Sequence, residues 1–283
     1  MYKMSFKDTL QERPIIGGVL IAVLFNVFLF LALLTQSFIY IALGEMHYLT
    51  IMWLQFSLMF GFLALLFLII VPYGLNLPGG VQTLGEYAEA IQLRGGSPPK
   101  HNIITVFITV AIFVAFELIG GLIFAEITFD FTKLFATPQP EYLGAFAWIY
   151  ALRPGIWEEI AFRGVVVTML LKKYSKKTSV IIDGILFGLV HLMNLLFGAD
   201  LIATIVQIAY ASILGFFLAY MYIKTRNLLS CILTHYLIDV FGQLFAMSFT
   251  NILVYFLVVV GMVVVIPVII NSYLIKRYTE RYF

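Results

Sequence analysis

Charged residues are scarce in this chain. Only 11% of its 283 residues are Asp, Glu, Lys or Arg, whereas 62% are hydrophobic. A soluble globular protein carries roughly 25% charged residues, so a surface that is solvated on all sides is excluded. Cysteine is also nearly absent, because Cys231 is the only one, and this excludes an intrachain disulfide framework. The composition therefore indicates an integral membrane protein.

Apolar segments long enough to cross a membrane follow one another along the sequence. A transmembrane helix needs roughly 20 predominantly apolar residues. The sequence predicts eight such helices, near residues 15–43, 47–74, 102–127, 143–171, 178–198, 201–223, 228–248 and 252–275. We expect an all-α, polytopic membrane protein whose helices enclose an intramembrane polar cavity. The first apolar run is too long for a signal peptide, so we expect this helix to be retained.

The basic residues predict the orientation of these helices. If the N-terminus is cytoplasmic, all but three of the 17 Lys and Arg residues fall on the cytoplasmic side. The exceptions are Lys133 in an outer loop and Arg153 and Arg163 inside the fourth helix. Because positive residues concentrate on the cytoplasmic side, we expect a multi-pass protein of the cell membrane with both termini cytoplasmic. A basic turn, which we expect to touch anionic lipid and not nucleic acid, is formed by Lys172, Lys173, Lys176 and Lys177.

The chain shows neither a Pro- or Ser-rich linker nor an internal repeat, so we expect a single membrane domain over residues 1–283. Residues 1–101 are expected to form an N-terminal two-helix extension with a short interfacial helix, and residues 102–275 the core of the domain. The interfacial helix is predicted from four residues at helical spacing, Leu84, Tyr87, Ala88 and Ile91. It is either an ordinary connector or an element that docks a substrate.

Ionisable residues inside the predicted helices are the candidates for function. Such residues near the bilayer centre are costly unless they are paired or hydrated. With a rise of ~1.5 Å per residue, Glu158 and His191 each lie ~20 Å from the cytoplasmic ends of their helices. His235 and Asp239 lie ~10 Å and ~16 Å from that end. We expect these four groups to meet in one pocket on the cytoplasmic side of the midplane.

Spacing separates the roles of the two adjacent glutamates. Glu159 and Arg163 are four residues apart, so they share a helix face and can form an ion pair. Glu158 points about 100° away and is left without that partner. One carboxylate is then structural and the other is free for chemistry. Taken alone, a Glu–Arg pair also suits helix packing or a transporter's ion path, and a single histidine such as His191 also suits a hydrogen-bonded core.

Two further carboxyl groups lie within the predicted helices. Asp183 is only a few residues from the basic turn, where we expect it to be capped or to snorkel. Glu117 lies deeper. We expect it either to line the cavity or to bond to a neighbouring helix.

Three motifs follow one another along the chain: EExxxR at Glu158, Glu159 and Arg163, FxxxH at Phe187 and His191, and HxxxN or HxxxD at His235 and Asp239. In this order they resemble the motifs of the CPBP family of intramembrane proteases, which includes the type II CAAX prenyl endopeptidases and the Abi proteins. The resemblance covers about residues 143–250. It implies an endopeptidase that cleaves within or beside the membrane, with residues 102–275 as its CPBP/Abi-like catalytic core.

The resemblance also implies a role for each motif residue. Glu158 and His191 would activate the nucleophilic water, because burial improves a carboxylate as a proton acceptor. His235 and Asp239 would stabilise the oxyanion. The supporting residues would be Glu159, Arg163 and Phe187.

One position departs from the common pattern of the family. Many members have Asn where this chain has Asp239, and an ionised Asp239 would repel an oxyanion. The side chain is either protonated or accepts the N–H of His235. A zinc site is a second interpretation, in which Glu158, His191 and His235 supply three ligands. The chain lacks an HExxH motif, and we expect a metal-free, glutamate-dependent reaction without a cofactor.

Two other functions compete with the protease. An ion-coupled transporter would use the same buried carboxylates, although no repeated pair of Gly- or Pro-broken helices is present. A non-catalytic membrane partner, of the bacteriocin immunity type, is the other alternative. For the protease, the expected partners are a membrane-associated peptide or protein substrate and the lipid bilayer.

Overall fold

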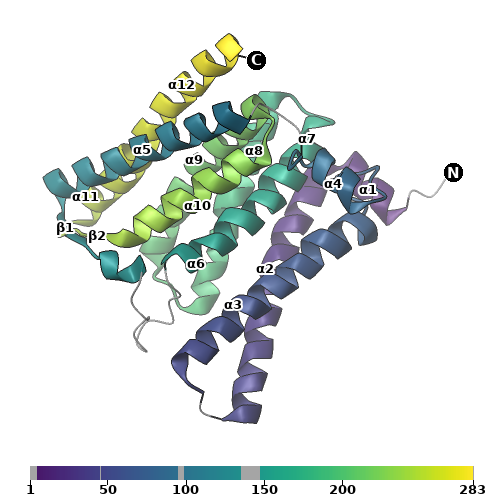
Figure 1. Ribbon diagram of the computed structural model, residues 1–283, viewed down its shortest axis with the longest axis horizontal. Helices are drawn as coiled ribbons and strands as arrows, with labels where there is room; N and C mark the ends of the chain where they lie inside the picture. The colour runs from purple at the N-terminus through teal and green to yellow at the C-terminus, as the bar shows by residue number, and fades with distance from the viewer. Residues whose placement is uncertain (1–4, 45, 95–98, 135–146, 283) are drawn as a thin grey trace.

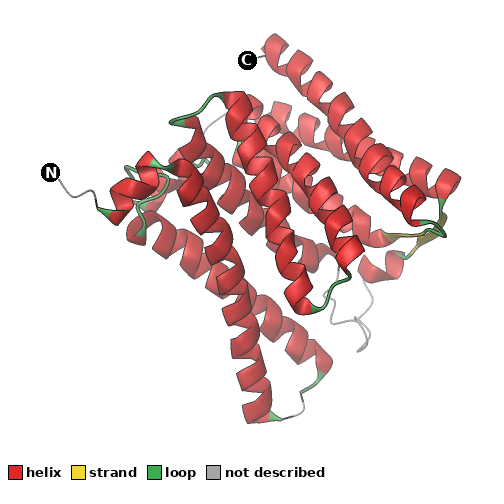
Figure 2. Cartoon of the chain, turned by 180° about the vertical axis from the view of Figure 1, so that it is seen from behind, coloured by secondary structure: helices red, strands yellow, loops and turns green. Residues whose placement is uncertain are grey.

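The computed structural model describes residues 5–44, 46–94, 99–134 and 147–282, and these are almost entirely helical (Figure 2). Within these ranges, six helices are long and apolar enough to cross a membrane: Pro14–Leu43, Leu49–Gly74, His101–Phe124, Lys176–Leu196, Leu201–Thr225 and Ile252–Glu280. Each coincides with a predicted segment to within a few residues, except that the last continues five residues further. The expected all-α, polytopic membrane architecture is therefore confirmed.

Helices make up both halves of the chain, and each half also contributes one short strand. The first half contains α1 (Phe6–Glu12), α2 (Pro14–Leu43), α3 (Tyr48–Leu65), η1 (Leu66–Gly74), α4 (Leu84–Ala90), α5 (Pro99–Phe124), β1 (Glu126–Phe129) and η2 (Phe131–Leu134). The second half contains α6 (Ala147–Arg153), η3 (Pro154–Glu158), η4 (Ile160–Val167), α7 (Thr168–Leu171), α8 (Lys176–Leu189), η5 (Val190–Phe197), α9 (Leu201–Thr225), α10 (Leu228–Leu244), β2 (Phe245–Ser248), α11 (Ile252–Phe256), η6 (Leu257–Val265) and α12 (Ile266–Tyr282).

Two of the eight predicted transmembrane helices differ from expectation. The helix predicted at 228–248 ends at Leu244, because β2 pairs antiparallel with β1 and Phe129 lies opposite Phe245. The two rings meet edge to face, with centroids 5.4 Å apart. The segment predicted at 143–171 is helical from 147 to 171, and residues 143–146 lie outside the described residues. The total of eight helices stays a prediction.

Both ends of the described chain lie toward one end of the bundle. Figure 1 shows α1 and the end of α12 on the side of α4 and α7, with the two strands at the opposite end. This arrangement agrees with an even number of crossings. The cytoplasmic location of the termini stays a prediction.

The N-terminal helices share their core with the rest of the protein. One cluster of buried apolar side chains extends from Leu10 in α1 to Ile275 in α12. The predicted short helix is present as α4, and Tyr87 and Ile91 are almost fully buried in that cluster. A capping box begins the helix, since Thr83 Oγ1 accepts from Glu86 N. The division between residues 1–101 and 102–275 stays a prediction.

Two lysines of the basic turn hold the N-terminal segment in place. The Lys172 ammonium donates to the carbonyl oxygen of Pro78, and the Lys173 ammonium donates to that of Glu12. Partial burial lowers the pKa of Lys172. At least these two lysines therefore fasten chain segments together, in addition to any contact with lipid.

Glycines bring the backbones of α8 and α9 together. A Cβ on Gly184 would lie 2.8 Å from the backbone nitrogen of Phe216, and one on Gly188 would lie 2.7 Å from the carbonyl oxygen of Ile208. Small residues at i and i+4 allow such close packing between membrane helices. The contact fixes the face of α8 that carries Phe187.

A third glycine brings η3 against α10. A Cβ on Gly155 would lie 3.0 Å from Cα of Tyr236, so only glycine allows this approach. The helix from Pro154 to Val167 is wound in the wider π form, which often accompanies functional sites. The adjacent glutamates thereby lie beside the helix that carries His235.

Candidate active site

A cavity of about 780 Å³ lies among the helices. Its lining includes Glu158, His191, His235 and Asp239, the four residues predicted to meet. They come from η3, η5 and α10, so three separate segments supply the polar groups. Aliphatic and aromatic side chains make up much of the remaining wall. The four residues that the sequence predicted to meet therefore line one cavity in the structure.

The two adjacent glutamates occupy different environments. Glu159 is fully buried, and its Oε1 lies 3.2 Å from Nη1 of Arg163, which confirms the predicted ion pair. Glu158 is partly exposed and lines the cavity. Within the described parts of the chain, no ion pair or hydrogen bond to Glu158 is present. Its carboxyl group is thus available to a molecule in the cavity.

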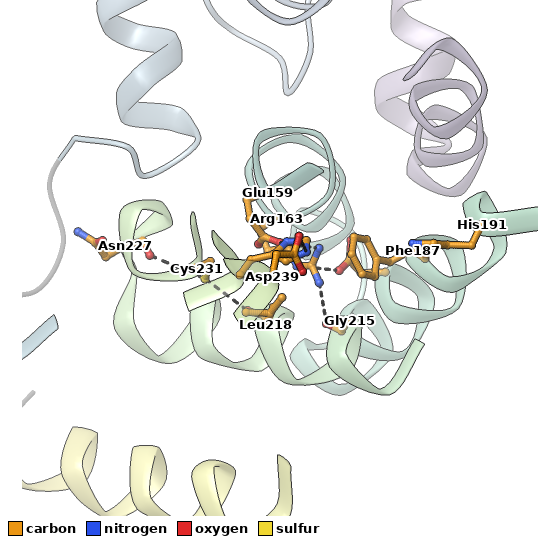
Figure 3. A network of polar contacts seen from close by, with 11 residues as sticks. Glu159, Arg163, Phe187, His191, Gly215, Leu218, Asn227, Cys231 and Asp239 are labelled. Atoms are coloured by element: carbon orange, nitrogen blue, oxygen red, sulfur yellow. Dashed lines mark hydrogen bonds and ion pairs between the residues drawn. The ribbon is translucent and has the colours of Figure 1, made fainter. Parts of the chain in front are cut away.

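Arg163 is held from several directions, as Figure 3 shows. Its Nε lies 3.7 Å from Oδ2 of Asp183, and its Nη2 donates to the carbonyl oxygen of Gly215 over 3.3 Å. The guanidinium carbon lies 4.2 Å from the centre of the Phe187 ring. These contacts fix the plane of the guanidinium group, and with it the position of Glu159.

The prediction for Asp183 is wrong. Its side chain is fully buried and faces Arg163, so it neither snorkels nor caps the helix at the basic turn. At 3.7 Å the contact with Asp183 is an ion pair and not a hydrogen bond, and the second carboxylate adds to the negative charge that surrounds the buried guanidinium. A signal was available, because Asp183, Phe187 and His191 are spaced four residues apart and share one face of the helix.

His235 connects the buried network to the cavity. Its Nδ1 lies 2.8 Å from Oε1 of Glu159, a contact that spacing within one helix could not reveal. Because a carboxylate oxygen accepts, Nδ1 carries the hydrogen in this bond. The other nitrogen, Nε2, lies 3.6 Å from Oδ2 of Asp239, which is too long for a hydrogen bond. The Phe187 ring packs edge to face against the imidazole, with centroids 5.8 Å apart.

The orientation of His191 follows from one contact with the backbone. Its Nδ1 lies 3.1 Å from the carbonyl oxygen of Phe187. A carbonyl can only accept, so Nδ1 is the donor and Nε2 of the neutral ring carries a lone pair. The FxxxH motif thus supplies both a ring against His235 and the carbonyl that sets the tautomer of His191.

A zinc site would need the three proposed ligands to converge on one point. Among the described residues, no group of three or more His, Cys, Asp and Glu side chains is placed to hold a metal ion. His235 uses Nδ1 for Glu159, and Nε2 has Asp239 as its nearest carboxylate neighbour. The three residues proposed as ligands therefore do not fit zinc in this arrangement.

A comparison with protein families agrees with this geometry. Residues 140–241 match the family model of the type II CAAX prenyl endopeptidases, Rce1-like. The match includes every motif residue from Glu158 to Asp239. These residues form an Rce1-like domain. The resemblance to the CPBP and CAAX protease family is therefore confirmed.

At the level of the family, the Rce1-like domain is that of a membrane protease. No curated protein and no solved structure matches the chain. The helices that precede the Rce1-like domain contribute to the same cavity, since Phe25, Gln55 and Glu117 are among its lining residues.

Proposed function

We propose that this protein is an intramembrane endopeptidase that hydrolyses a peptide bond of a membrane-associated peptide or protein. The observation that carries the proposal is the placement of Glu158, His191 and His235 on one cavity, while Glu159 is held in the buried ion pair with Arg163. One glutamate is then free to act on water. The other orients a histidine.

Glu158 and His191 are the proposed pair that activates water. The carboxylate of Glu158 takes a proton from a water molecule, and the resulting hydroxide attacks the peptide carbonyl carbon. The lone pair on Nε2 of His191 accepts a hydrogen bond from the same water and orients it. The tetrahedral intermediate then collapses, its C–N bond breaks, and protonated Glu158 donates its proton to the leaving amine, which leaves a new carboxyl terminus and a new amino terminus.

His235 is the proposed donor to the oxyanion. Glu159 accepts a hydrogen bond from Nδ1–H of His235. When the ring carries a second proton, its Nε2–H points toward Asp239 on the cavity wall. A fixed donor in a site of low dielectric stabilises the developing negative charge strongly. Asp239 is proposed to act in its protonated form, as a second donor.

The proposed substrate class follows the family description, which is that of the type II CAAX prenyl endopeptidases. The wall of the cavity also suits an apolar segment, because it includes Phe25, Phe113 and Leu214. We propose a membrane-associated chain as the substrate. We further propose that both termini face the cytoplasm, because the basic residues concentrate on that side.

The test compares variants in two settings, as purified protein in liposomes and in whole cells. Glu158→Gln and His191→Ala are each expected to lower kcat by about 10²–10⁴-fold, since each removes a proton-transfer or positioning group. Glu126→Gln, which removes an exposed carboxylate from β1, serves as the matched control. Membrane proteomics of cells with wild-type protein or Glu158→Gln identifies the substrate as the chain that accumulates uncleaved.

Chelation separates the proposed mechanism from one that depends on zinc. Activity is expected to survive prolonged treatment with a chelator and to be unchanged by added Zn²⁺. Full activity of Glu158→Gln, or loss on chelation with recovery on adding zinc, would each overturn the mechanism. Ion flux in the liposomes without peptide cleavage would support the transporter instead.

A further inference from the structure

A carboxylate outside the Rce1-like domain lies on the wall of the same cavity. Glu117 belongs to α5 (Pro99–Phe124), which precedes residues 140–241. It is partly buried and lines the cavity together with Glu158 and Asp239. The proposed hydrolysis does not use it.

Among the described residues, the carboxylate of Glu117 has no polar partner and can contact a molecule in the cavity. An ideal Cβ built on Gly242 would lie 3.9 Å from Oε1 of Glu117, so this oxygen faces bare backbone of α10. Gly242 follows Asp239 by three residues on the same helix, which places both near one helix face. Within the described residues, Glu117 has neither an ion pair nor a hydrogen bond.

The nearest candidate for a partner in the cavity is directed elsewhere. Arg153 is the only Lys or Arg among the described lining residues. Its Nη1 lies 3.5 Å from Sδ of Met59, and its guanidinium carbon lies 5.5 Å from the centre of the Tyr150 ring. Glu117 therefore faces the cavity without a compensating cation from these residues.

The charges around Glu117 favour a positively charged ligand. Two basic groups on the cavity wall are engaged elsewhere, Arg153 with Met59 and Tyr150 and His235 with Glu159, so neither compensates the carboxylate of Glu117. An unpaired carboxylate at membrane depth is costly, and a cation that enters offsets this cost.

Next to Gly242, the side-chain nitrogen of Gln243 is buried without a hydrogen-bond partner, so a donor is available for a peptide carbonyl.

We propose that Glu117 is a specificity-determining residue that binds a positively charged Lys or Arg side chain of the substrate. This inference rests on the proposed endopeptidase function. The basic side chain lies over Gly242, where the absence of a Cβ provides room for it. The peptide bond to be cleaved then lies one helical turn away, beside Asp239.

The experiment uses pairs of apolar model peptides built of leucine and alanine. The two peptides of a pair differ at one position, which is lysine in one and uncharged norleucine in the other. This position is moved along the peptide from one pair to the next. Affinity and cleavage are measured with the full chain in detergent micelles. The wild-type protein is expected to bind at least one lysine peptide about tenfold or more tightly than its norleucine partner, as for a desolvated charge pair. Glu117→Gln is expected to abolish the preference, and Glu117→Lys to reverse it.

Two further variants guard against a purely structural effect. Glu126→Gln makes the same change in net charge outside the cavity and is expected to keep the preference. Gly242→Val fills the space beside Oε1 of Glu117 and is expected to weaken binding of the lysine peptide without removing a charge. It also replaces Glu117→Gln as the test if that variant does not fold.

The outcomes separate this inference from the proposed function. Cleavage of the lysine and norleucine peptides with equal kcat/KM, in the wild type and in Glu117→Gln alike, overturns the role of Glu117 and leaves the endopeptidase intact. Selective binding of lysine peptides without any cleavage supports the cationic subsite and overturns the endopeptidase. An equal loss of affinity for both peptides in Glu117→Gln also overturns the inference.

Discussion

Nδ1 of His235 lies 2.8 Å from Oε1 of Glu159, although 76 positions separate the two residues in the sequence. The same oxygen lies 3.2 Å from Nη1 of Arg163. One buried carboxylate oxygen therefore joins a structural ion pair to a histidine on the cavity wall. The second glutamate of the EExxxR motif is a positioning residue for His235 as well as a partner for Arg163.

The first prediction concerns Glu159→Gln. The amide keeps the shape of the side chain but loses the charge that orients His235 and pairs with Arg163. We take the size of the effect by analogy with residues that orient metal-ligating histidines, whose loss typically costs about 10–100-fold in activity. We expect kcat to fall by about that factor while KM changes little. The ¹⁵N shifts of the His235 ring, compared with wild type, check that the loss acts through this residue; unchanged shifts with a lower kcat would contradict the explanation.

The second prediction concerns the pairing of Arg163 with Asp183. Arg163→Met leaves the carboxylates of Glu159 and Asp183 buried without their cation, which is expected to cost about 3–5 kcal/mol of unfolding free energy. Asp183→Leu added to Arg163→Met removes one of the stranded charges, so the double variant is expected to be more stable than the sum of the single effects. Denaturant titration of the four proteins in micelles measures the coupling. Strict additivity would show that the two side chains do not interact.

The third prediction concerns Asp239. Asn at this position is a neutral donor of nearly the same shape, so Asp239→Asn is expected to retain most of the activity if the carboxyl group acts protonated. Asp239→Leu removes the donor and is expected to lower kcat by about 10²-fold. Cleavage assays of the two variants at equal expression make the comparison. A large loss in Asp239→Asn would favour an ionised Asp239 that orients His235 instead.

The fourth prediction concerns the close contact of α8 with α9. In Gly184→Ala the new methyl group would lie 2.8 Å from the backbone nitrogen of Phe216, so the helices must move apart. Overpacking of this kind typically costs about 1–3 kcal/mol. Because Phe187 lies on the same helix, we expect kcat to fall too. Gly261→Ala is the control, since no atom lies within 4 Å of a Cβ built there, and its unfolding in micelles is expected to match that of the wild type.

The sequence by itself determined the class of the protein and the pairs within one helix. Apolar segments of fixed length predict helices because the bilayer leaves backbone polar groups no other partners. Spacing of four residues predicted the pairing of Glu159 with Arg163, since such residues share a helix face. The order of the three motifs indicated which polar residues belong to one site.

Only the tertiary structure decided which groups meet across helices. The bond from His235 to Glu159, the burial of Asp183 beside Arg163 and the place of Glu117 over Gly242 all depend on how α5, α8 and α10 pack. Packing is set by glycine contacts between backbones, and periodicity within one helix says nothing about the rotation of its neighbour. The strand that begins at Phe245 likewise depends on its pairing with β1, which lies far away in the sequence, so no local pattern could predict it.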